Sequence, residues 1–193
     1  MRFESVKHKP SVTNEKNFEK LFKNPLTNQA NCGIIYTVKE REVHKPMAKA
    51  IYLDMDGTIA DLYGVEGWLN DLIASRTRPY EQAKPIYNMS KLARALNKAQ
   101  KRGVRIGVIS WLSKSGTEDY NEAVTKAKRK WLKKHLKSVK FDEVYIVPYG
   151  TPKGTLAVEN SILFDDEERN RNEWNKGNAF PPEKIFEVLR FFS

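Results

Sequence analysis

The sequence contains one cysteine and no long apolar run. Because Cys32 is the only cysteine among 193 residues, an intramolecular disulfide is excluded. The first residues show no apolar core of a secretory signal, and no stretch reaches the roughly 20 apolar residues that a membrane-spanning helix needs. We therefore expect a cytoplasmic protein that uses no disulfide and does not enter a membrane.

The hydrophobic content is sufficient for a sizeable core. With 40% hydrophobic residues, a chain of this length predicts one α/β domain and a small accessory segment. Lysine and arginine number 34 against 24 aspartates and glutamates, which gives a formal net charge of +10. This excess favours phosphorylated or polyanionic partners through long-range attraction.

Much of the positive charge lies in residues 126–137. Apolar residues accompany it at helical spacing, namely Val124, Ala127, Trp131, Leu132 and Leu136. The simpler interpretation is an amphipathic helix with a solvated basic face. A nucleic-acid-binding face is the alternative.

The chain divides into two parts of different composition. Residues 1–48 are polar and without repeats, which is typical of an N-terminal extension. Within them, residues 33–38 predict an edge strand or hairpin, and residues 1–30 are expected to form a short helix or to be partly disordered. Residues 49–193 are expected to form the main domain.

In the main domain, short apolar segments alternate with amphipathic helices. This alternation predicts an α/β fold with a doubly wound, Rossmann-like parallel sheet and helices on both of its faces. The predicted strands lie at about 50–54, 105–110, 143–147 and 161–165. The predicted helices begin at Ser90, at Thr117 or Glu118, and at Pro181; the first of them ends at Gly103.

Two carboxylates follow the first predicted strand, in the sequence Asp-Met-Asp-Gly-Thr from residue 54 to residue 58. The carboxyl ends of parallel strands are where open α/β sheets bind ligands, and Gly57 allows the chain to turn away. Asp54 and Asp56 would then face one pocket, where one acid attacks phosphorus and the other transfers a proton. An ordinary Asp-Gly turn is the alternative.

The three later strands also end in polar side chains. Ser110 closes the second strand and would donate to a phosphoryl oxygen, although Ser113 in the same loop competes for this role. Lys153 follows the third strand, where an ammonium group would keep Asp54 ionised and offset phosphoryl charge. The fourth strand ends in the adjacent acids 165 and 166.

Asp165 and Asp166 repel each other unless a cation neutralises them. Mg²⁺ is the cation that suits them best, because it prefers hard oxygen ligands and needs only a few carboxylates beside a substrate phosphate. The alternative is that these acids only begin a helix at its favourable end.

The four segments together, over about residues 49–190, resemble the motifs of the haloacid dehalogenase (HAD) superfamily. The resemblance implies that Asp54 is a nucleophile forming an aspartyl-phosphate, and that Asp56 is a general acid whose carbonyl also binds Mg²⁺. The implied magnesium ligands are Asp54, Asp56, Asp165 and Asp166. The implied catalytic residues are Asp54, Asp56, Ser110 and Lys153, and the implied substrate contacts are Gly57, Thr58, Ser110, Trp111 and Lys153.

In this superfamily the insert after the first motif selects the substrate, and here it spans about residues 61–89, which is enough only for a small cap. Its aromatic and basic side chains would either stack a base and bind a second anion or pack the core; they are Tyr63, Trp68, Arg76, Arg78, Tyr80 and Tyr87. Residues 54–61 further resemble 5′(3′)-deoxyribonucleotidases.

The expected function is therefore Mg²⁺-dependent hydrolysis of a nucleotide or other small phosphate ester. The alternatives are a polynucleotide end phosphatase and a non-enzymatic, basic nucleic-acid-binding protein on the same scaffold.

Overall fold

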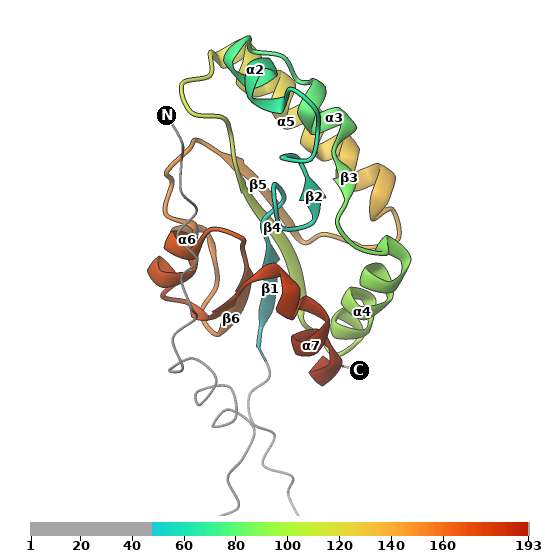
Figure 1. Cartoon of the computed structure of the whole chain (residues 1–193). Helices are drawn as coiled ribbons and strands as arrows, with labels where there is room; N and C mark the ends of the chain where they lie inside the picture. The colour runs from blue at the N-terminus through green and yellow to red at the C-terminus, as the bar shows by residue number, and fades with distance from the viewer. Residues whose placement is uncertain (1–47, 193) are drawn as a thin grey trace, which may run out of the picture. The chain divides into compact units, whose positions relative to one another are not determined.

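The computed structural model describes residues 48–192 (Figure 1). The strand or hairpin predicted at residues 33–38, like the rest of the N-terminal extension up to residue 47, lies outside the described residues. Among the described helices, none is both long and apolar enough to cross a membrane.

The core of the described part is a five-stranded parallel sheet. Its strands are β1 (Ala50–Leu53), β4 (Arg105–Trp111), β5 (Glu143–Val147), β6 (Ser161–Phe164) and β7 (Gly177–Phe180). Their order in the sheet is β5-β4-β1-β6-β7, and every neighbouring pair is parallel. The chain thus builds outward from β1 on one side and then on the other, which confirms the predicted doubly wound α/β fold.

Burial and register position the ends of β1 and β6. All residues of these two strands are buried, as expected for parallel strands covered on both faces. Leu53 is paired with Phe164 of β6 and with Val108 of β4. One residue after this pair, the Asp54 amide donates to the Phe164 carbonyl at 2.9 Å. The acidic residues that follow β1 and β6 therefore emerge at the same edge of the sheet.

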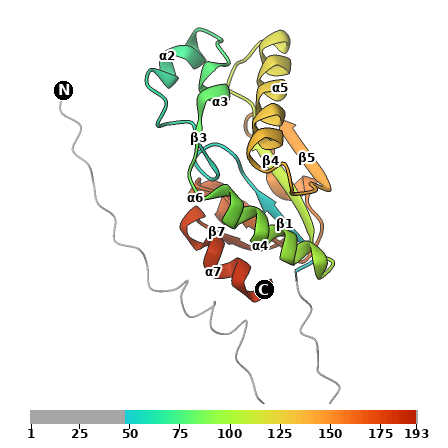
Figure 2. The same cartoon turned by 90° about the vertical axis from the view of Figure 1, so that its right-hand side faces the viewer.

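The helices of the described residues are α2 (Trp68–Ile73), α3 (Arg78–Gln82), α4 (Met89–Lys101), α5 (Glu118–His135), α6 (Glu168–Glu173) and α7 (Ile185–Leu189), and the 3₁₀ turns are η1 (Lys153–Leu156), η2 (Pro182–Lys184) and η3 (Arg190–Phe192). Helices α4 and α7 pack against each other beside the sheet (Figure 2).

Side-chain caps fix the starts of the two longest helices. Asn88 caps α4 by accepting from the Lys91 amide at 3.0 Å, so this helix begins slightly before the predicted cap, Ser90. Thr117 caps α5 by accepting from the Tyr120 amide, as one of the two predicted starts requires.

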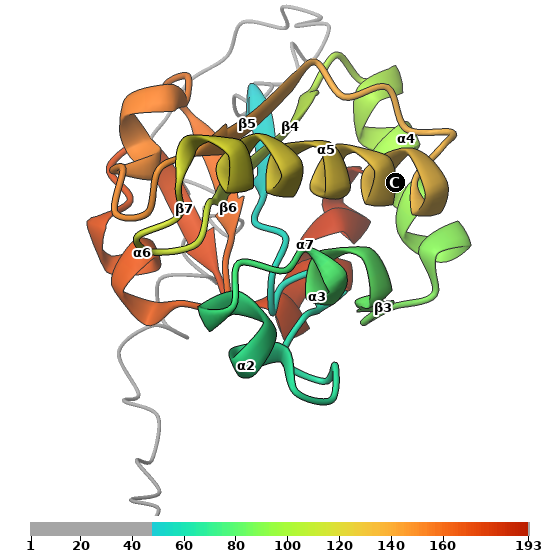
Figure 3. The same cartoon turned by 90° about the horizontal axis from the view of Figure 1, so that it is seen from above.

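A small insert lies between β1 and α4. It consists of α2, α3 and the antiparallel pair β2 (Ala60–Asp61) and β3 (Lys84–Pro85). Two hydrogen bonds attach it to α5: Trp131 Nε1 donates to the Ala83 carbonyl at 2.7 Å, and the Tyr120 hydroxyl to the Arg76 carbonyl at 3.2 Å. Figure 3, which looks down on this end of the molecule, shows α2, α3 and α5 around the carboxyl end of β1.

Candidate active site

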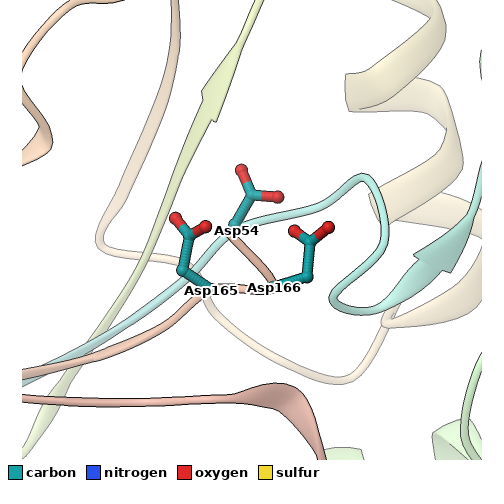
Figure 4. A group of neighbouring side chains, drawn as sticks. All are labelled: Asp54, Asp165 and Asp166. Atoms are coloured by element: carbon teal, nitrogen blue, oxygen red, sulfur yellow. The ribbon is translucent and has the colours of Figure 1, made fainter. Parts of the chain in front are cut away.

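Three carboxylates meet at the carboxyl edge of the sheet. Asp54 follows β1, and Asp165 and Asp166 follow β6. One oxygen from each of these side chains lies within 4.8 Å of the others, and Figure 4 shows the three carboxylates side by side. The parallel pairing of β1 with β6 thus brings together acids that are more than a hundred residues apart in sequence.

Lys153 joins two of these carboxylates. Its Nζ lies 2.7 Å from Asp54 Oδ1 and 2.6 Å from Asp165 Oδ2, and its side chain is only 3% exposed. Burial by itself lowers the pKa of Lys153, but the charges of Asp54 and Asp165 outweigh it and raise the pKa. The predicted lysine therefore reaches the first aspartate as an ammonium ion.

Asp165 is held from several sides. It is fully buried, and its carboxylate accepts from Asn170 Nδ2 at 3.1 and 3.2 Å and from the Glu167 amide at 3.0 Å. Arg171 Nη1 donates to the carbonyls of Asp165 and Asp166, at 2.8 and 2.6 Å. Asp165 is consequently a fixed group that orients its neighbours.

The electrostatics of the three carboxylates favour a bound cation. Burial, followed by the charge of Asp54, raises the pKa of Asp165 to about 6. Burial and the charges of Asp54 and Asp165 raise the pKa of Asp166 to about 7. One ammonium, that of Lys153, stands against three carboxylates here, and the hard oxygen donors fit Mg²⁺.

Thr58 and Gly57 shape the turn after β1. Thr58 is completely buried; its Oγ1 donates to Asp166 Oδ1 at 3.3 Å and accepts from the Asp166 amide at 3.1 Å. Gly57 has φ +77°, and a Cβ at this position would lie 2.3 Å from Asp166 Oδ2. Gly57 and Thr58, which the resemblance implies are substrate contacts, thus lie against Asp166.

Asp56, the second acid of the motif, has a different environment from Asp54. Its Oδ2 accepts from Lys128 Nζ at 2.6 Å, and its side chain keeps 19% of its surface exposed. Burial raises the pKa of Asp56, and the Lys128 charge opposes this rise. Its side chain lies outside the cluster of three carboxylates, so its predicted metal contact through the backbone carbonyl stays a prediction.

Lys128 is a site residue that the sequence interpretation missed. The solvated basic face predicted for residues 126–137 is wrong at this position, because the Lys128 side chain is only 1% exposed. Arg129, Lys130 and Lys133 on the same helix are exposed, as predicted. The available signal is spacing, since Lys128 lies four residues after the buried Val124 on the apolar stripe.

Ser110 and Trp111 end β4 beside this group. Lys128 Nζ donates to Ser110 Oγ at 2.8 Å and to the Trp111 carbonyl at 2.6 Å. Ser110 is completely buried, whereas Ser113 lies beyond the strand next to the Tyr120 phenol. The structure thus connects Ser110, rather than Ser113, to Asp56 through Lys128.

The aromatic residues of the insert have different surroundings. Tyr63 is 46% exposed and packs edge-on against Trp68, with ring centroids 5.1 Å apart. Tyr80 is buried, and Tyr87 packs edge-on against Phe186 of α7. Tyr63 lies against the motif, with its Cε2 2.8 Å from the position that a Cβ of residue 57 would take.

The two arginines expected to bind a second anion are paired within the insert. Arg76 Nη1 lies 3.0 Å from Asp71 Oδ1, and Arg78 bonds to the other oxygen of the same buried carboxylate. Arg78 also donates to the Glu66 carbonyl at 2.7 Å. These contacts indicate that both arginines hold the insert together.

Comparison of the sequence with known protein families and with curated proteins gives no match. Comparison with solved structures finds the D,D-heptose 1,7-bisphosphate phosphatase of Burkholderia thailandensis, with 14% identity and a TM-score of 0.45 over 72% of this chain and 84% of that one. A protein of Mesorhizobium loti described as a HAD-like phosphatase shares 14% identity, with a TM-score of 0.46 over 76% of this chain and 87% of its own. An uncharacterized protein of Corynebacterium glutamicum shares 13% identity, with a TM-score of 0.40 over 75% and 95%. The activities named are those of the other proteins.

Proposed function

We propose that this protein is a HAD-type, Mg²⁺-dependent phosphomonoester hydrolase that acts through an aspartyl-phosphate. The observation that carries the proposal is the junction of Asp54 with Lys153 at 2.7 Å, beside Asp165 and Asp166. A carboxylate that accepts from a buried ammonium and lies at the end of a central parallel strand is arranged as a nucleophile toward phosphorus.

The acidic cluster suits one magnesium ion. The side chains of Asp54 and Asp166, with the backbone carbonyl of Asp56, would hold it, while Asp165 orients the group from its fixed position. A bound Mg²⁺ supplies positive charge that offsets the phosphate oxygens and polarises the phosphorus centre.

The reaction then divides between the two acids of the motif. Asp54 attacks phosphorus, the ester oxygen leaves, and Asp56 gives that oxygen a proton. Asp56 next takes a proton from water, which attacks the aspartyl-phosphate, releases inorganic phosphate and restores Asp54. Burial supports the first proton transfer, because it raises the pKa of Asp56 and so favours its protonated form.

A nucleotide or another small ester with a planar group is the proposed substrate class. Tyr63 supports this choice, since it is 46% exposed and lies against Gly57 at the motif. An aromatic ring at that place offers a stacking surface for a planar leaving group.

The test is a panel of phosphate esters assayed with and without Mg²⁺. It includes ribo- and deoxyribonucleotides, sugar phosphates, p-nitrophenyl phosphate and phosphorylated oligonucleotides. Asp54→Asn preserves the shape of the side chain but removes the nucleophile, so we expect kcat to fall by at least about 10³-fold. Asp119→Asn, at an exposed position on α5, is the matched control and should leave kcat unchanged.

Two results would contradict the proposal. One is a folded wild-type protein that hydrolyses no member of the panel, which would favour the nucleic-acid-binding alternative. The other is an Asp54→Asn variant that keeps wild-type turnover.

A further inference from the structure

Lys128 is a buried cation to which the reaction described above gives no role. Its side chain lies on α5 and is 1% exposed, and Tyr80 of the insert covers it with its ring centroid 5.1 Å from Nζ. Burying an ammonium ion is costly, and an apolar side chain would fill the same stripe of α5 more simply. The contacts of Lys128 therefore need a functional explanation.

The hydrogen bonds of Lys128 use its full donor capacity. A lysine ammonium has three N–H donors, and Nζ has three acceptors, namely Asp56 Oδ2 at 2.6 Å, Ser110 Oγ at 2.8 Å and the Trp111 carbonyl at 2.6 Å. Two of these acceptors are side chains of the proposed site. The third, a backbone carbonyl, fixes where Nζ lies.

This arrangement dictates the direction of the Ser110 hydroxyl. Because Ser110 Oγ accepts from an ammonium, which has no lone pair to offer in return, its own hydrogen has to point elsewhere. Ser110 lies two positions beyond Val108, which pairs with Leu53 immediately before Asp54. At this carboxyl edge of the sheet, where Asp54 ends the neighbouring strand, the hydroxyl hydrogen is then available to a bound ligand.

The same ammonium also orients Asp56. Since Oδ2 of Asp56 is held by Lys128, the carboxyl group is fixed in rotation and Oδ1 is left to carry the proton to the leaving oxygen. In a buried environment such a charge-assisted hydrogen bond is strong and tolerates little movement.

We propose that Lys128 is a positioning residue that aims the Ser110 hydroxyl at the phosphoryl group and presents Oδ1 of Asp56 to the leaving group. This inference rests on the proposed phosphatase function. It assigns Ser110, and not Ser113, as the phosphoryl donor, and it makes one side chain of α5 responsible for both groups.

The first experiment compares two substrates that differ in their need for an acid. Ethyl phosphate requires protonation of its leaving oxygen, whereas p-nitrophenolate leaves without a proton. Lys128→Met should lower kcat for p-nitrophenyl phosphate by about 10²-fold through the misdirected Ser110. For ethyl phosphate we expect a further loss of about tenfold or more, because Asp56 is also misplaced.

The matched control is Lys130→Met, which removes the same charge from an exposed position of the same helix. It should keep kcat and KM for both esters within about twofold. Circular dichroism verifies the fold of each variant. If Lys128→Met does not fold, Lys128→Gln retains amide donors at this position and the same comparison of esters is made with it.

The second experiment is a double-mutant cycle with Ser110→Ala. If Lys128 acts through Ser110, then on p-nitrophenyl phosphate the double variant should be at most about threefold worse than Ser110→Ala alone. Equal losses on both esters, or independent losses that multiply in the double variant, would overturn the proposal. A wild-type protein without phosphatase activity would instead remove the proposed function itself, and the wild-type assays reveal this before any variant is made.

Discussion

At the scale of single residues, the site gives its two motif aspartates different partners. Asp54 faces Lys153 and the other carboxylates, whereas Asp56 faces Lys128. Two acids two positions apart in the sequence thus experience unlike electrostatic environments. Such a difference is what separates a nucleophile, which has to be ionised, from a general acid, which has to carry a proton.

The pKa values of Asp165 and Asp166 predict how stability depends on pH. Both pKa values, about 6 and about 7, lie above the roughly 3.9 of an unfolded aspartate. The folded, metal-free protein therefore retains protons that the unfolded chain releases, and its free energy of unfolding should fall as the pH rises from about 4 to about 7. Mg²⁺ should raise Tm more at about pH 8 than at about pH 5, because protons compete with the metal for the carboxylate of Asp166.

Thermal denaturation with EDTA or with Mg²⁺ across this pH range measures the effect. Asp166→Asn is the informative comparison, since it should reduce both the pH dependence and the shift that Mg²⁺ produces. An equal Mg²⁺ shift in Tm at both ends of the range would contradict the prediction.

At the scale of elements, the turn after β1 has to accommodate the end of β6. Gly57→Ala should damage the site for two reasons: its φ of +77° is strained for alanine, and the new Cβ would lie 2.3 Å from Asp166 Oδ2. Gly103→Ala, after α4, is the control. Its φ of +83° gives the same backbone strain, but no atom lies within 4 Å of its Cβ position, so the new side chain meets no neighbour.

Each of these two substitutions should destabilise the protein by about 1–2 kcal/mol through backbone strain. Only Gly57→Ala should also weaken Mg²⁺ binding, measured by titration calorimetry, and lower phosphatase kcat. Equal metal affinity in the two variants would show that the contact with Asp166 is unimportant.

The elements differ in how well the sequence predicts them. Apolar runs that are buried on both faces reveal β1 and β6, and the Thr117 cap reveals the start of α5. By contrast, β7 consists of four residues that begin with Gly177, and it depends on its pairing with β6 rather than on a pattern of its own. The short strands β2 and β3 likewise depend on their pairing with each other and have no sequence pattern that predicts them.

The residues of the candidate site also differ in how well the sequence predicts them. Asp54 and Asp165 could be expected to meet because each one ends a strand of the same parallel sheet. Lys128 could not be assigned, because its bond to Asp56 joins residues 72 positions apart and depends on how α5 packs over the sheet. Spacing on a helix indicates that a residue is buried, but it does not identify the group that it contacts.

At the scale of the whole molecule, the residues of the candidate site converge from both halves of the sheet. Ser110 arrives from β4 on one side of β1, and Asp165 and Asp166 arrive from β6 on the other. The insert contributes Tyr80 over Lys128 and Tyr63 beside Gly57. The doubly wound topology therefore does more than support the site, because the site exists only where the two halves meet.

The net charge of +10 makes salt dependence the test that separates a small substrate from a polynucleotide. A small ester engages only the site, so between about 50 and 200 mM KCl its kcat/KM should fall by no more than about threefold. A phosphorylated oligonucleotide would also contact exposed lysines such as Lys130 and Lys133, and each neutralised phosphate would add about −0.7 to the slope of log affinity against log salt.

We expect the small ester to have the higher kcat/KM, and the double substitution Lys130→Gln and Lys133→Gln to leave its turnover unchanged. A higher kcat/KM on the oligonucleotide, with a slope steeper than about −3 that the same substitutions reduce, would establish the polynucleotide end as the substrate. Under either result the roles proposed for Asp54 and Asp56 stay the same. The charge on α5 would decide which phosphate ester reaches Asp54, and the two acids would break the ester bond in the same way.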